Sequence, residues 1–178
     1  MPILGTVASQ FAGKPFASFE SIQTATVGSG GSSAINFTSI PSTFTHLQLR
    51  YIWRSGNSAE VSVVFNSDGG NNYYRHILYA SAGGIAATSS QSNVFGGYQD
   101  PVANTFCGAV MDILDYTDTN KYKTVRTSWG IDTSGSGWQG LSSGLWKNTN
   151  AISSISLAVS GGSGIAQYSH FALYGIKG

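Results

Sequence analysis

The residue types most often used in catalysis are present, but their spacing does not group them. The three histidines, His46, His76 and His170, fall in separate segments, and no pair has a metal-binding spacing such as His-Glu-x-x-His. Serines occur mostly in glycine-rich turns, and the nucleophile motif Gly-x-Ser-x-Gly is missing. The sequence therefore predicts no metal centre and no nucleophilic catalytic site. His46 and His170, which lie in alternating segments, are expected to face solvent or a polar neighbour.

The carboxylates do not indicate acid–base catalysis either. Glu20 and Glu60 accompany the aspartates, and none of these residues has the apolar surroundings that raise a carboxyl pKa in a glycoside hydrolase. Asp112, Asp115 and Asp118 have a spacing that could bind a cation, although carboxylates beside a turn are usually exposed to solvent. We expect a protein without enzymatic activity and without a cofactor.

Two glycine-rich stretches match ligand-binding motifs in part. Gly135-Ser-Gly-Trp-Gln-Gly140 has the glycine spacing of a dinucleotide-binding loop, but the residues after it do not begin a helix that would hold a pyrophosphate. Asn66-Ser-Asp-Gly-Gly-Asn-Asn72 resembles a calcium loop with its glycine out of register and no glutamate at its last ligand position. Neither stretch predicts a ligand.

Aromatic residues in polar stretches are the best candidates for a contact site. Six of them lie in or near segments rich in Gly, Ser and Asn, which we expect to be loops: Tyr73, Tyr74, Tyr98, Trp129, Trp138 and Trp146. Such rings can cover the ends of a core, fill a subunit interface or stack on a sugar. These three alternatives stay open, and Tyr73, Tyr98 and Trp138 are the candidates for an interface or glycan contact.

The composition predicts one soluble domain of low charge. Among 178 residues, 41% are hydrophobic and 10% are charged, against about 25% charged in ordinary soluble domains. The net charge of +1 leaves no basic stripe for nucleic acid, and Lys121, Lys123 and Arg126 lie near aspartates that are expected to neutralise them. The single cysteine, Cys107, has apolar neighbours and is predicted to be a buried thiol. No signal peptide or membrane span is visible, so we expect no membrane partner.

From residue 18 onward, apolar and polar residues alternate with a period of two, which is typical of half-buried strands. One face of Thr45–Arg54 carries four large apolar residues: Leu47, Leu49, Tyr51 and Trp53. Similar runs lie at Glu60–Asn66 and Ile152–Val159, and Thr117–Asn120 is expected to join two neighbouring strands. Eight or so strands separated by turn residues predict a single all-β domain over 18–178, an antiparallel sandwich or barrel.

Residues 1–17 lack this periodicity but contain large apolar side chains: Ile3, Leu4, Val7, Phe11 and Phe16. A frayed end gains nothing from such residues. We therefore expect an extended N-terminal arm that packs on a partner surface.

Several segments, in their order and spacing, resemble one family of proteins. They are Phe19 to Gly31, Phe37 to Arg50, Leu145-Trp146 with Ile152 to Leu157, and a final segment that ends in His-Phe-Ala-Leu-Tyr-Gly-Ile-Lys-Gly178. Together they resemble virion structural proteins of tailed bacteriophages, including cyanophages. The resemblance covers the chain from about residue 18 to residue 178.

The resemblance implies a particle component rather than an enzyme: an antiparallel β-sandwich of jelly-roll type, homotrimeric, at the virion surface after assembly in the host cytoplasm. The chain has no long fibre shaft and no coiled-coil heptads, which favours a capsid decoration (cement) protein that binds the major capsid protein. The alternative is a tail-fibre or tail-associated module that contacts host surface glycans, with tail proteins as partners.

Overall fold

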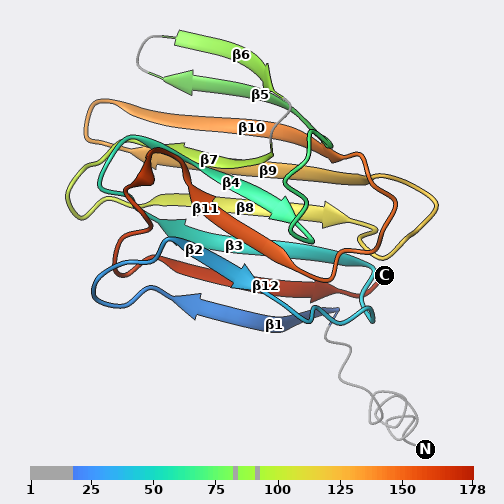
Figure 1. Ribbon diagram of the computed structural model, residues 1–178. Coiled ribbons are helices and arrows are strands. Elements are labelled where there is room, and N and C mark those ends of the chain that lie inside the picture. The colour runs from blue at the N-terminus through green and yellow to red at the C-terminus, as the bar shows by residue number, and fades with distance from the viewer. Residues whose placement is uncertain (1–17, 82–83, 91–92) are drawn as a thin grey trace, which may run out of the picture.

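Two antiparallel sheets pack face to face in the computed structural model, which describes residues 18–81, 84–90 and 93–178 (Figure 1). The prediction of an all-β sandwich is confirmed. The strand order is compatible with the expected jelly-roll connectivity. The predicted arm at 1–17 lies outside the described residues. In the described part of the chain, no helix is long and apolar enough to cross a membrane.

The larger sheet has eight strands, and the smaller sheet has four. The order in the larger sheet is β1 (Phe19–Thr26), β12 (His170–Ile176), β3 (His46–Trp53), β8 (Cys107–Leu114), β9 (Lys123–Asp132), β10 (Gly137–Trp146), β5 (Tyr73–Ser81) and β6 (Gly84–Ser90). The order in the smaller sheet is β2 (Ala34–Phe37), β11 (Ile155–Val159), β4 (Ala59–Phe65) and β7 (Val94–Gln99). A short 3-10 turn at Ser160–Gly162 follows β11.

The alternation in the sequence sets which face of each strand is buried. Leu47, Leu49 and Trp53 on β3 are fully buried between the sheets, as predicted. Ile52, which interrupts the polar face of the same strand, points to the outside and is 48% exposed. The predicted connection at Thr117–Asn120 is also confirmed, because β8 and β9 form an antiparallel pair on either side of it.

The aromatic residues in or near glycine-rich segments were expected to lie in loops, and this expectation is wrong. All six of them lie on strands of the two sheets. The physical reason is visible at Gly140 on β10, where a Cβ atom would lie 2.7 Å from Cζ2 of Trp129. Glycine leaves space for a large neighbouring ring, so it occurs inside this strand despite its low strand propensity.

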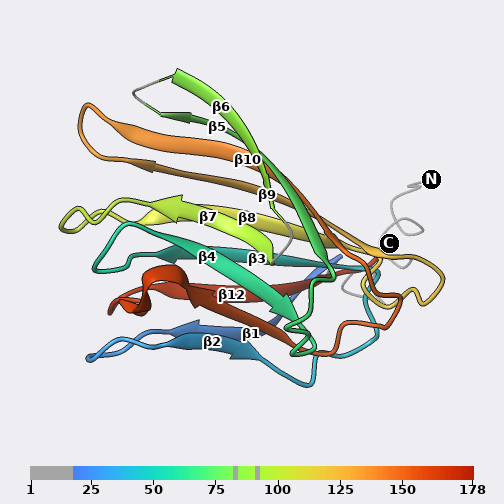
Figure 2. The same ribbon diagram turned by 45° about the horizontal axis from the view of Figure 1, so that its top comes forward.

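The smaller sheet covers only part of the larger one. β7 packs across β8, β9 and β10 and also contacts β5, whereas β6 lies beyond it at one side of the sandwich (Figure 2). The opposite, outer face of the eight-stranded sheet is covered by no other element that the structure describes. These two features position the candidate sites.

Candidate functional site

A row of small and apolar side chains crosses the outer face of the eight-stranded sheet. Val110 on β8 lies opposite Ser128 on β9, which lies opposite Leu141 on β10. Leu141 in turn lies opposite Leu78 on β5, and Leu78 opposite Ala87 on β6. Leu141 is 59% exposed and Leu78 53% exposed. Large apolar side chains that adjoin one another on a surface mark an interaction site more often than isolated ones do.

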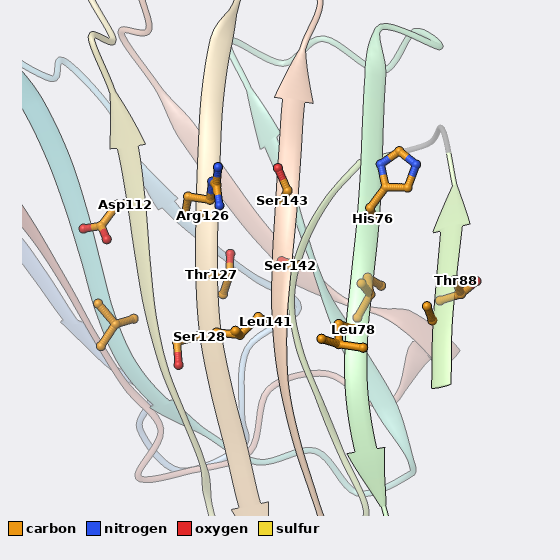
Figure 3. A pocket seen from close by; sticks show the side chains of 13 residues that line it. His76, Leu78, Thr88, Asp112, Arg126, Thr127, Ser128, Leu141, Ser142 and Ser143 are labelled. Carbon is orange, nitrogen blue, oxygen red and sulfur yellow. The ribbon is translucent and has the colours of Figure 1, made fainter. Parts of the chain in front are cut away.

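The next row along the same strands is polar. Asp112, Arg126, Ser143 and His76 lie opposite one another in turn from β8 to β5 (Figure 3). The two rows line a hollow of about 700 Å³. We call this hollow, with the rows that line it, the outer trough. Its apolar row offers a partner contact area. Its polar row offers both hydrogen-bond donors and acceptors, and side chains of both charges.

The hollowed surface continues across the sheet toward β12. A second hollow of about 590 Å³ shares Val110 and Ser128 with the first and extends to His170. Gly108 and Gly130 lie opposite each other in its lining, so no side chain rises there from two adjacent strands. A partner can therefore approach the sheet closely over a long strip.

Tyr98 and Trp138 come together at a second site, on the side where β7 ends the smaller sheet. The ring of Trp138 lies 4.9 Å from that of Tyr98 in an edge-to-face arrangement and 5.6 Å from that of Tyr79. With Phe95 and Trp129 they line a cavity of about 400 Å³. We call this cavity the aromatic cleft.

Asp100 fixes two rings of the aromatic cleft. Its carboxylate accepts hydrogen bonds from Nε1 of Trp138 at 2.5 Å, from Oγ of Ser58 at 2.8 Å and from the hydroxyl of Tyr98 at 3.1 Å. Burial opposes ionisation of Asp100, but these three donors outweigh it and hold the pKa of the carboxyl below its ordinary value. The carboxylate therefore stays charged at neutral pH.

An ion pair forms the polar wall of the aromatic cleft. Arg75 on β5 binds Glu60 on β4 through two hydrogen bonds of 3.0 and 3.2 Å. The guanidinium also donates to Asn93 at 2.7 Å and lies over the ring of Phe95 at 5.2 Å. Such a bidentate pair fixes the carboxylate while leaving further lone pairs of its oxygens free to accept hydrogen bonds.

Tyr73, the third aromatic candidate, is a core residue, so its assignment to a surface contact is wrong. It is fully buried and lies near Phe65 and Trp146, with ring centroids 6.3 and 6.5 Å away. Its hydroxyl accepts a hydrogen bond from the backbone amide of Phe65, and burial raises its pKa to about 12.

The other candidate residues are dispersed or already paired. His46 accepts a hydrogen bond from the amide of Asp115, and His170 bonds to Thr26, which confirms polar neighbours for both. Asp115 and Asp118 bind Lys121 at 2.6 and 3.3 Å. In the described part of the chain, no three metal-binding side chains gather.

Cys107 is a fully buried thiol, as predicted. Burial raises its pKa to about 12, so the thiol stays protonated at neutral pH and is a poor nucleophile.

The arm candidates at 1–17, namely Ile3, Leu4, Val7, Phe11 and Phe16, lie outside the described residues. The apolar row of the outer trough was missed by the sequence analysis. The sequences of β5 and β10 do not alternate between apolar and polar residues, so they gave no signal that Leu78 and Leu141 face outward.

Comparison with protein-family models, with curated proteins and with solved structures found no match.

Proposed function

We propose that this chain is a non-enzymatic structural protein of a tailed-phage virion, and that it decorates the assembled capsid shell. The observation that carries the proposal is the outer trough, a long uncovered sheet face with Leu141 and Leu78 more than half exposed. Adjoining exposed apolar side chains on such a face mark an interaction site. The partner is a shell subunit, the major capsid protein, and the predicted arm at 1–17 adds apolar contacts to it.

The low charge of the chain supports this role. A net charge of +1 produces little repulsion between many copies on one particle. A protein that binds the assembled shell in preference to free subunits stabilises the shell by mass action. The proposal includes a jelly-roll connectivity and a homotrimer. Sedimentation of the purified protein would measure the mass of the oligomer.

The test compares occupancy of purified shells by chain variants. Leu141→Asp places a charge in the centre of the outer trough, and we expect it to reduce occupancy at least tenfold. Asn36→Asp adds the same charge on the exposed side of β2, in the other sheet, and we expect it to leave occupancy unchanged. Deletion of residues 2–16 should also abolish binding while the domain stays folded. Unchanged occupancy for Leu141→Asp contradicts the proposal, and unchanged occupancy for the deletion contradicts the role of the arm.

A tail-associated module that contacts host glycans is the second candidate. The aromatic cleft favours it, because Tyr98 and Trp138 come together there with polar groups beside them. Imaging of the protein in intact particles distinguishes a position on the shell from a position on the tail.

A further inference from the structure

We propose that the aromatic cleft is a binding site for a neutral sugar unit of a polysaccharide. The inference deepens the second candidate function and is independent of shell binding through the outer trough. It concerns the isolated chain, whatever its place in a particle.

The rings at the cleft supply the apolar part of such a site. A hexose has one face of C–H groups, and that face packs on a flat aromatic ring. Trp138 is partly exposed and lies between Tyr79 and Tyr98, which are also partly exposed. Phe95 and Trp129 are buried and form the floor, with an edge-to-face contact of 5.5 Å between them. The cavity of about 400 Å³ is within the range of small-molecule sites.

The ion pair supplies the polar part. The carboxylate of Glu60, with its side chain 27% exposed, can accept hydrogen bonds from two neighbouring hydroxyls of a sugar. Arg75 holds this carboxylate in place, so binding costs little side-chain ordering. Asp100 positions the rings of Trp138 and Tyr98 through hydrogen bonds and keeps them in one orientation.

The charges at the site select the class of sugar. Glu60 and Asp100 contribute two negative charges beside the single positive charge of Arg75, which Glu60 already binds. An acidic sugar would meet net repulsion, and among the described residues that line the cleft it would find no cation besides the paired Arg75. The site therefore fits a neutral sugar rather than a sialic or uronic acid.

The experiment titrates the full chain with methyl glucoside, methyl galactoside and methyl mannoside, and with N-acetylneuraminic acid as the acidic comparison. Binding is followed by NMR chemical-shift changes of the tryptophan indole N–H groups. We expect at least one neutral glycoside to bind, with the signal of Trp138 among those that move, and the acidic sugar not to bind.

Two variants test the residues. Trp138→Ala removes the stacking ring, and Glu60→Gln keeps the shape of the site while removing its charge; each should raise the dissociation constant about tenfold or more. Tyr122→Ala removes a partly exposed ring away from the cleft and should leave binding unchanged. Circular dichroism shows whether each variant is folded. If Trp138→Ala does not fold, the dissociation constant of Glu60→Gln provides the test of the site.

The inference is overturned if no neutral glycoside binds the wild-type chain at tens of millimolar, if N-acetylneuraminic acid binds as well as the neutral sugars, or if Glu60→Gln binds as the wild type does. None of these results affects the shell-binding proposal. Conversely, if Leu141→Asp does not change shell occupancy, the shell-binding proposal is wrong but sugar binding by the aromatic cleft is unaffected. The two experiments therefore distinguish failure of one proposal from failure of the other.

Discussion

Lys123 brings a cationic side chain into the interior, where it is fully buried. Nearby aspartates were expected to neutralise Lys123 and the cations near it in the sequence, and they do so for Lys121, which binds Asp115 and Asp118. Lys123 instead donates to three backbone carbonyls, those of Asp118, Lys121 and Thr149. One ammonium group thereby ties the β8–β9 connection to the segment after β10.

Replacement of Lys123 by Met keeps most of the apolar stem but leaves these three carbonyls without their donor. Because unsatisfied buried polar groups are costly, we expect the free energy of unfolding to fall by about 3 kcal/mol. Chemical denaturation measures it. Lys121→Met, at an exposed position, is the matched control and should leave the unfolding midpoint nearly unchanged. Equal effects of the two variants would contradict the role assigned to Lys123.

Asp68 gives the domain a pH dependence. Its carboxylate accepts hydrogen bonds from Nε1 of Trp146 at 2.8 Å and from Nδ2 of Asn72 at 2.9 Å, and these bonds lower its pKa. Since the pKa is lower in the folded state than in the unfolded state, the stabilisation is complete above pH of about 4. It is lost as the pH falls through the folded-state pKa.

Asp68→Asn should therefore flatten the acid limb of a plot of melting temperature against pH between 7 and 2. Trp146→Phe, which keeps an aromatic ring but removes the largest contributor to the pKa shift, should flatten it in part. If the melting temperature of Asp68→Asn falls as steeply at acid pH as that of the wild type, Asp68 is not the source of the pH dependence.

At the scale of the element, β10 shows how glycine can be part of a strand. A Cβ atom on Gly140 would lie 2.7 Å from Cζ2 of Trp129 and 2.8 Å from the carbonyl oxygen of Leu78. Gly108 on β8 faces the outer side of the sheet, and a Cβ there would meet nothing within 4 Å.

Gly140→Ala should therefore lower the free energy of unfolding by about 1–3 kcal/mol through overpacking. Gly108→Ala should leave stability unchanged or raise it by up to about 1 kcal/mol, because alanine restricts the unfolded chain. Denaturant midpoints of the two variants provide the comparison. A stable Gly140→Ala variant would show that the ring of Trp129 can move away at little cost.

The same contrast explains which elements the sequence analysis predicted. β3 and β4 alternate large apolar with polar residues, so positions such as Leu47 and Val63 indicate which face of each strand is buried. In β10 the buried face includes Gly140, Ser142 and Gly144, and its missing bulk is supplied by neighbours such as Trp129 and Val94. The pattern of hydrophobicity along β10 alone therefore does not show which face of the strand is buried.

At the scale of the whole molecule, the aromatic cleft could not be predicted for a related reason. Glu60, Arg75, Tyr98 and Trp138 come from four strands, β4, β5, β7 and β10, and meet because the smaller sheet ends at β7. Tyr98 and Trp138 were recognised as candidates by their residue type alone. Their partnership with Asp100 depends on how the sheets are placed, which no local spacing reveals.

The pairing of β1 with β12 has a kinetic consequence. Phe19 lies opposite Ile176, and β12 separates β1 from β3 within the sheet. Segments near opposite ends of the described chain must find each other before this side of the sheet can close, and such high contact order slows folding to milliseconds or seconds in all-β domains. Until β1 has paired, β12 presents an unpaired edge that can capture a neighbouring chain. Refolding yield should therefore fall as protein concentration rises.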